Sequence, residues 1–312
     1  MYLGVINLPR SARVKSHDGI YHVMLRSISD INLFKDDNDK DKFMMYIKRY
    51  KVQFGFKVYA YCLMSNHVHI IIDCNGGDIS KIMHGINQSY AQYYNKKYNR
   101  YGHLFQDRFK SKIVDNERYL VVLSLYIHNN PKDIAEYKHN IENYFYSSLG
   151  IYLGIRKDTK NILDKKVMIN IVSGNYKRFK IKYKLMLKMN VSETEFEDYD
   201  FTLQEGCYEY RSERSLICRD KSHLVILSIL LKRFNLKRDA LFLKNNREIC
   251  EFKSIFILLC RNLCNMSYKE LGKILINNSQ ANLSRLCSNG IELVMEDIRY
   301  KNIIENVYEQ VF

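Results

Sequence analysis

The stretch Ser65-Asn66-His67-Val68-His69-Ile70-Ile71-Ile72-Asp73 predicts a β-strand, because β-branched residues run through its second half. Successive side chains of a strand point to opposite faces of the sheet, so His67 and His69 share one face. Two neutral imidazoles placed in this way can bind one divalent cation. The alternative is a pair of half-exposed histidines on an edge strand, and the motif alone favours neither interpretation. The alternating residues expected to face a hydrophobic core are Val68, Ile70 and Ile72.

Strand and helix patterns surround this stretch in an order that predicts an α+β fold. The strand before it is separated from it by little more than Ser65 and Asn66, so the two strands should form a hairpin. The whole order, strand, helix, strand, strand, helix, strand, helix, is a ferredoxin-like split βαβ with one added helix. The expected elements are strand 20–27, helix 39–54, strand 56–64, the histidine strand, helix 79–98, a loop with a short strand within 102–114, and helix 117–129.

The charge balance favours an anionic partner. Lys and Arg number 49 against 34 Asp and Glu, which gives a formal net charge of +15. Such a surplus favours nucleic acid, although a basic protein without an anionic partner is the alternative. No run of about 18 apolar residues is present, and the first residues lack the charged start of a signal peptide. We therefore expect a cytoplasmic protein that does not bind a membrane.

The chain divides into two predicted domains. Residues 8–190 form the first, residues 191–219 a linker that includes the acidic stretch 192–206, and residues 220–312 an all-helical region. In that region Ser267 and Glu270 have the spacing of a capping box, and Asn277-Asn278 separates helix 266–275 from a short helix 279–286. This pattern resembles a helix-turn-helix motif, with a generic helical hairpin as the alternative. The second helix would present Gln280, Asn282 and Arg285 to a major groove.

The helix at 117–129 ends in a second polar group. Tyr126 and Asn130 are four residues apart and therefore share a face. Beside the histidine strand, Asn130 could add an amide oxygen as a third metal ligand, and the Tyr126 hydroxyl could act as a nucleophile next to the cation. Taken singly, Tyr126 could also be a half-buried core tyrosine, Asn130 an ordinary helix-end residue before Pro131, and Tyr119 is the competing nucleophile.

Five blocks of sequence, in order, carry a family resemblance over about residues 8–190. The blocks are Gly19–Val23, Met64–Ile72, Tyr101–Ser111, Tyr126–Pro131 and Tyr146–Gly150. Through them the chain resembles the REP-associated tyrosine transposases, single-domain relatives of the IS200/IS605 transposases (Y1 type) in the HUH endonuclease superfamily. The helical extension after residue 190 and the first nine residues depart from the shortest members.

The resemblance implies the site and the chemistry. His67 and His69 would be the metal ligands, Asn130 a further ligand, Tyr126 the nucleophile, and Mg²⁺ or Mn²⁺ the cofactor. The implied activity is that of a metal-dependent single-stranded DNA endonuclease and strand transferase, a transposase-like enzyme that forms a 5′-phosphotyrosine intermediate on hairpin-containing DNA. The protein would act as a monomer or a homodimer.

Basic and aromatic residues around position 100 suit a single-stranded partner, because bases stack on aromatic rings while cations hold the phosphates. The remaining alternatives are a non-catalytic regulator that binds duplex DNA through the helix-turn-helix, and an RNA-binding protein with a ferredoxin-like sheet. The expected nucleic-acid-binding residues, besides those of the helix-turn-helix, are Arg10, Arg13, Lys15, Arg100, Tyr101, Phe105, Gln106, Arg108, Phe109, Lys110 and Lys112.

Overall fold

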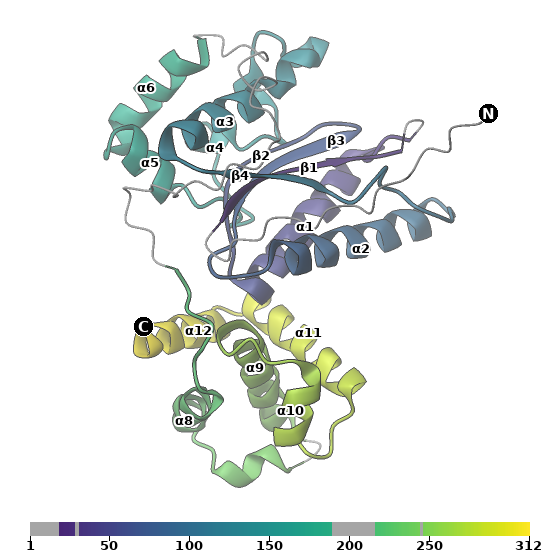
Figure 1. The fold of residues 1–312 in the computed structure, drawn as a ribbon, viewed down its shortest axis with the longest axis vertical. Helices are drawn as coiled ribbons and strands as arrows, with labels where there is room; N and C mark the ends of the chain where they lie inside the picture. The colour runs from purple at the N-terminus through teal and green to yellow at the C-terminus, as the bar shows by residue number, and fades with distance from the viewer. Residues whose placement is uncertain (1–18, 29–30, 189–215, 244–245) are drawn as a thin grey trace, which may run out of the picture.

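An antiparallel sheet forms the centre of the first domain (Figure 1). The structure, a computed structural model, describes residues 19–28, 31–188, 216–243 and 246–312. The strand order β2-β3-β1-β4 is that of a ferredoxin-like fold, and β2 and β3 pair as the expected hairpin. The predicted α+β class is therefore confirmed. The strands are β1 (Ile20–Arg26), β2 (Lys57–Leu63), β3 (His67–Asp73) and β4 (Lys110–Val114).

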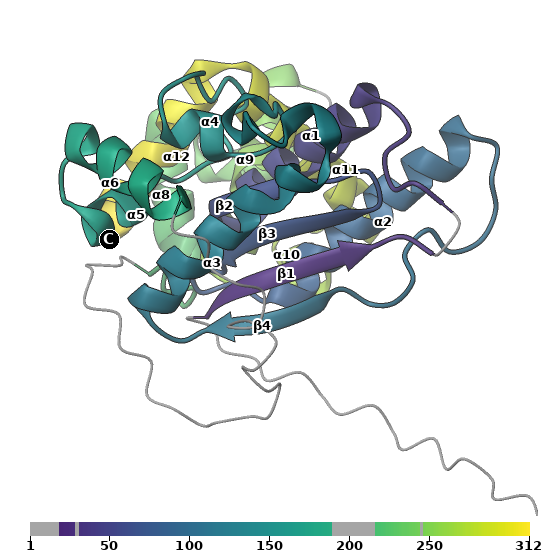
Figure 2. The same ribbon diagram turned by 90° about the horizontal axis from the view of Figure 1, so that it is seen from above.

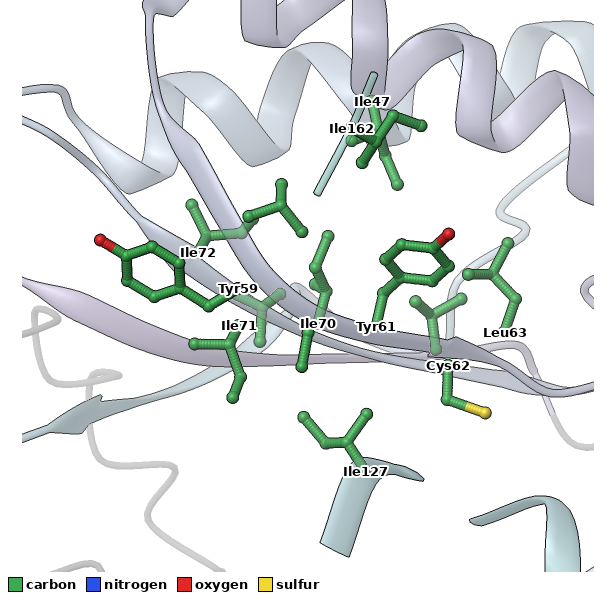
Figure 3. Packing of buried hydrophobic residues seen from close by; sticks show 14 of the residues in the cluster. Ile47, Tyr59, Tyr61, Cys62, Leu63, Ile70, Ile71, Ile72, Ile127 and Ile162 are labelled. Atoms are coloured by element: carbon green, nitrogen blue, oxygen red, sulfur yellow. The ribbon is translucent and has the colours of Figure 1, made fainter. Parts of the chain in front are cut away.

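Helices cover both faces of this sheet. In Figure 1, α1 (Asp37–Phe54) and α2 (Ile79–Lys97) lie on one face and α3 (Glu117–Asn129) on the other. From above, α3 crosses the sheet obliquely (Figure 2). Strands buried on both faces carry continuous rather than alternating apolar runs, which explains the run from Ile70 to Ile72. Ile72 lies on the side of α1, whereas Ile71 lies on the side of Ile127 in α3 (Figure 3).

Polar side chains begin each of these three helices. Asp36, Asp78 and Asn116 accept hydrogen bonds from backbone amides in the first turns of α1, α2 and α3. The Asp36 cap places the start of α1 at residue 37, two residues earlier than the sequence predicted. The predicted stripe on α2 is confirmed, since each of its members is buried: Ile82, Ile86, Tyr90 and Tyr94.

Beyond α3 the chain turns back across the first domain. Pro131 lies in a 3-10 turn that directly follows α3, so the helix ends where predicted. Buried Tyr152, Phe179 and Tyr183 join the core that the sheet began. This first core extends from Ile20 to Leu187. The elements after α3 are the 3-10 turns Asn130–Asp133, Ala135–Tyr137 and Ile141–Asn143 and the helices α4 (Leu149–Tyr152), α5 (Lys166–Val172) and α6 (Tyr176–Lys188).

The C-terminal region is helical and encloses a second core. The predicted capping box of Ser267 and Glu270 is present at the start of α10. The helix after it was predicted to be short but runs from residue 280 to 296, because its apolar stripe continues and Gly290 lets it approach the backbone of Ser254 closely. The elements are α8 (His223–Arg233), a 3-10 turn (Arg238–Leu241), α9 (Arg247–Leu263), α10 (Tyr268–Ile274), α11 (Gln280–Glu296) and α12 (Ile298–Val311).

The regions that enclose the two cores are in direct contact. Arg219 donates hydrogen bonds to the carbonyl oxygens of Phe54 and Asn75 in the region of the sheet and to Asn262 in the C-terminal region. Most of the predicted linker, through residue 215, lies outside the described residues. Among the residues that the structure describes, no helix has the length and apolar character needed to cross a membrane.

Candidate active site

Pairing of β3 with β1 brings a third histidine to the predicted pair. Met24 lies opposite His69 and Arg26 opposite His67, so the side chains of β1 with even numbers share the histidine face. On this face His22 stacks on His69, with ring centroids 5.2 Å apart. The His22 Nε2 and His69 Nδ1 atoms are 2.9 Å apart, a hydrogen-bond distance.

The surroundings of these rings keep them uncharged at neutral pH. Burial, together with the neighbouring His22 and His67, lowers the pKa of His69 well below its usual value. Burial and then the charge of Lys112 lower the pKa of His22 to about 4. Burial also lowers the pKa of His67. Neutral imidazoles are the form that binds metal ions.

Helix α3 and the 3-10 turn that follows it bring Tyr126 and Asn130 to the same place. The Tyr126 ring meets the His69 ring edge-on, with centroids 5.5 Å apart. The Asn130 amide nitrogen donates to the Tyr126 carbonyl at 3.0 Å, which orients the Asn130 Oδ1 atom toward His67, 3.4 Å from its Nε2. The spacing of four residues therefore does place both side chains beside the two histidines.

The protonation of His67 and His69 decides which of their nitrogen atoms could bind a divalent cation. His67 Nδ1 lies 2.7 Å from the Asn66 Oδ1 atom, and since that oxygen can only accept, the ring proton sits on Nδ1. His67 Nε2 then presents a lone pair beside the Asn130 oxygen, an arrangement of two acceptors that suits a shared cation. If His69 donates from Nδ1 to His22, its Nε2 is likewise available. Among the described residues, no cluster of three or more His, Cys, Asp and Glu side chains is placed to hold a metal ion.

A cationic edge borders the site. Lys112 lies opposite His22, and Lys110 lies opposite Met24, so both lysines share the histidine face with exposed Arg26. The Lys112 ammonium lies 5.2 Å from the centre of the Tyr119 ring. Tyr119 is seven residues before Tyr126, roughly 10 Å along the helix axis, and it therefore sits at the β4 edge rather than against His69.

The other predicted DNA contacts have varied surroundings. Tyr101 is 88% exposed, and Gln106 and Arg108 are exposed, whereas Phe105 is half-buried. Arg100 holds the loop that contains them, because its guanidinium donates to the Asn95 side chain and to the His103 carbonyl.

Three groups of predicted contacts remain. Phe109 is only 7% exposed, so it does not offer an open stacking surface as expected. Arg10, Arg13 and Lys15 lie outside the described residues. At the start of α11, Gln280 and Arg285 are exposed, and half-buried Asn282 accepts from Arg285 at 2.9 Å.

Behind the site, His128 fixes helix α3 in the core. Its Nδ1 lies 2.7 Å from the Tyr183 hydroxyl and its Nε2 2.6 Å from the Ser148 hydroxyl, and all three side chains are buried. Burial lowers the pKa of His128 to about 3, with a smaller contribution from Arg156, so the ring is neutral. These two contacts anchor α3 to the buried side chains of Tyr183 and Ser148.

Sequence reasoning assigned no role to His22, Arg26 or His128. His22 and Arg26 are four residues apart in one strand, so the sequence did indicate that they share a face. It did not indicate that this strand pairs with the histidine strand in the register Arg26–His67, which is what makes them part of the site.

Comparison with known proteins agrees with the resemblance. Residues 15–130 match the family model described as "Transposase IS200 like". The chain is also similar to a solved structure titled "Structure of the REP associates tyrosine transposase bound to a REP hairpin", with 16% identity and a TM-score of 0.41, over 47% of this chain and 86% of that chain. No curated protein matches the chain. The match to this family therefore covers residues 15–130 of a chain of 312 residues.

Proposed function

We propose that the protein is a DNA strand transferase that cleaves and rejoins single-stranded, hairpin-bearing DNA through Tyr126. The observation that carries the proposal is the convergence of Tyr126, His69, His67 and Asn130 on one spot, from a helix and a strand nearly sixty residues apart. The family match over residues 15–130 supports it.

In the proposed reaction the Tyr126 Oη atom attacks a phosphodiester phosphorus. A bond forms between Oη and phosphorus, the bond from phosphorus to the 3′ oxygen breaks, the phenol proton passes to solvent, and the 3′ oxygen leaves with a proton as a hydroxyl. A phenol with its usual pKa near 10 is a weak nucleophile at neutral pH. Mg²⁺ or Mn²⁺ held by His67, His69 and Asn130 would polarise the phosphate and offset the charge that develops on it.

The remaining residues of the site position these groups. His22 orients the His69 ring through the 2.9 Å contact between their nitrogens. Arg26, Lys110 and Lys112, on the histidine face, would hold the DNA phosphates on either side of the scissile bond. Because the phosphate remains in a phosphotyrosine linkage, a free 3′-hydroxyl can attack it later, and rejoining needs no nucleotide cofactor.

The same proposal includes a second DNA-binding surface, formed by helices α10 and α11. Exposed Gln280 and Arg285 lie in the first turns of α11, directly after the turn that follows α10, as the base-contacting residues of a helix-turn-helix do. We assign duplex DNA next to the hairpin to this surface.

The test uses a hairpin oligonucleotide with a single-stranded flank, labelled at either the 3′ or the 5′ end, with Mn²⁺. A 5′-phosphotyrosine linkage carries the 3′ label onto the protein in denaturing gels and releases the 5′ label on a free fragment. EDTA should abolish both products. A 5′ label on the protein would contradict the proposed chemistry, and cleavage that persists in EDTA would contradict the metal.

A further inference from the structure

The turn between β2 and β3 places Asn66 directly beside His67. The Ser27 amide, at the end of β1, donates to the Asn66 carbonyl at 3.0 Å. The Met64 amide closes the turn by donating to the His67 carbonyl at 2.9 Å. The backbone on both sides of the half-buried Asn66 side chain is therefore held in place.

Two acceptor oxygens lie beside the two ring nitrogens of His67. The Asn66 Oδ1 atom is 2.7 Å from His67 Nδ1, and the Asn130 Oδ1 atom is 3.4 Å from His67 Nε2. A neutral imidazole carries a single ring proton, so it can donate to only one of these oxygens. Which nitrogen carries the proton is set by the hydrogen bonds of the ring. The contact at 2.7 Å has the length of a good hydrogen bond, whereas 3.4 Å is long for one, so the pair of contacts favours the proton on Nδ1.

The other tautomer would remove two proposed metal ligands at once. With its proton on Nε2, His67 would have no lone pair on the side of Asn130 and would donate to the Asn130 oxygen instead. Asn130 keeps that oxygen toward His67, because its amide nitrogen donates to the Tyr126 carbonyl at 3.0 Å. The position of one proton on His67 therefore decides whether both atoms can bind a cation, although the charge of the ring does not change.

Asn66 is the side chain that opposes this unfavourable tautomer. Taken alone, the acceptor oxygen of Asn130 would draw the His67 proton to Nε2. The Asn66 oxygen, at the shorter distance, draws it to Nδ1. The proposed cleavage chemistry assigns no other role to Asn66.

We propose that Asn66 is a positioning residue for the metal site, which holds the His67 proton on Nδ1 and so keeps His67 Nε2 and Asn130 Oδ1 available to one cation. The inference rests on the proposed function, since it assumes that a cation binds between these two atoms. Asn66 acts on the cation only through His67, as the hydrogen-bond partners of metal-binding histidines do.

Nitrogen NMR of the histidine rings in the metal-free protein tests the tautomer directly, with His67→Ala to assign the signals. We expect the His67 proton on Nδ1 in the unmodified chain and on Nε2 in Asn66→Leu, which removes the acceptor at similar side-chain size. Asn66→Ala should give the same result as Asn66→Leu, so the outcome does not depend on how leucine packs. Asn66→Asp keeps an acceptor oxygen and should keep the proton on Nδ1.

The affinity for Mn²⁺, measured from the EPR signal of the unbound ion, tests the consequence. We expect Asn66→Leu and Asn66→Ala to bind Mn²⁺ at least about tenfold more weakly, the lower end of the effect of replacing a partner of a metal-binding histidine. Asn66→Asp should show no such loss. Ser65→Ala changes an exposed side chain in the same turn and is the matched control, which should alter neither the tautomer nor the affinity. The ring signals of His22 and His69 report whether β1 and β3 remain paired.

A His67 proton on Nε2 in the unmodified chain, or one that stays on Nδ1 in both Asn66→Leu and Asn66→Ala, would overturn the inference. A proton that moves to Nε2 without any loss of Mn²⁺ affinity would overturn it as well. If the unmodified chain bound no Mn²⁺ while the tautomers changed as expected, the proposed metal site would fail and the role of Asn66 in placing the proton would stand.

Discussion

The two cores of the protein differ in the polar groups that they enclose. In the first, His69, His128, Ser124, Ser147, Ser148, Asp39 and Asp73 are buried among the apolar side chains, whereas the second buries only Lys253, Ser254 and Asn262 among the described residues. Buried polar groups destabilise a core unless they are fully hydrogen-bonded. In the first core, four of them belong to the two elements of the candidate site: His69 and Asp73 lie in β3, and Ser124 and His128 lie in α3.

The largest effect should come from the site itself. Replacing His67 with alanine removes one proposed metal ligand and the partner of Asn130. We therefore expect strand cleavage to fall by a factor of at least about 100, measured with the end-labelled hairpin. DNA binding should persist, because the cationic edge is unchanged. His139→Ala, at an exposed histidine, is the matched control. Full cleavage activity of His67→Ala would contradict the proposal that His67 is a metal ligand.

The next largest effect should be on stability, and substitutions in the two cores should differ in it. His128→Leu leaves the Tyr183 and Ser148 hydroxyls buried without the imidazole, and we expect it to lower the free energy of unfolding by about 2–4 kcal/mol. Lys253→Met in the second core replaces a buried cation with an apolar chain of similar size and should change it by less than about 1 kcal/mol. Urea denaturation measures the free energy of unfolding of both variants. Equal losses of stability would contradict the proposed difference between the two cores.

Low pH should also destabilise the first core selectively. Burial alone would raise the pKa of Asp39, but hydrogen bonds from Lys97 and Tyr98 outweigh it, and the pKa is lowered below its ordinary value of 3.8. A carboxyl with a lowered pKa in the folded state contributes stability above pH 3.8, which is lost as the pH falls below that value. Asp39→Asn should therefore be less stable at neutral pH and flatten the acid limb of the stability curve. An unchanged acid limb would contradict the role of this group.

The smallest effect should lie in the second domain. Arg285→Ala should weaken binding to duplex DNA by about tenfold or less and reduce the slope of log affinity against log salt by about 1. Cleavage of a short hairpin oligonucleotide should not change. A loss of cleavage equal to the loss of duplex binding would show that the two domains do not divide the work as proposed.

Much of the fold could be predicted from local patterns, because strands and helices follow side-chain periodicity and capping residues. The His-x-His strand and the helix from 117 to 129 are examples. Features that depend on contacts between distant segments could not. The length of α11 depends on the packing of Gly290 against α9, and the burial of Phe109 depends on where the loop closes.

The same distinction holds within the candidate site. The spacing of Tyr126 and Asn130 placed them on one helix face, and the structure brings that face to His67 and His69. The role of His22 required the pairing register of β1 and β3, which no local pattern specifies. Arg100 had the charge of a DNA contact, but its guanidinium bonds to the loop.

The central claim is that Tyr126 is the nucleophile. The direct measurement is mass spectrometry of the peptide that carries the DNA after cleavage of the hairpin substrate, in the unmodified chain and in Tyr126→Phe and Tyr119→Phe. We predict that the nucleotide is attached to Tyr126, that Tyr119→Phe still forms the adduct, and that Tyr126→Phe forms none while it still binds the DNA. An adduct on Tyr119, or one that persists in Tyr126→Phe, would contradict the account.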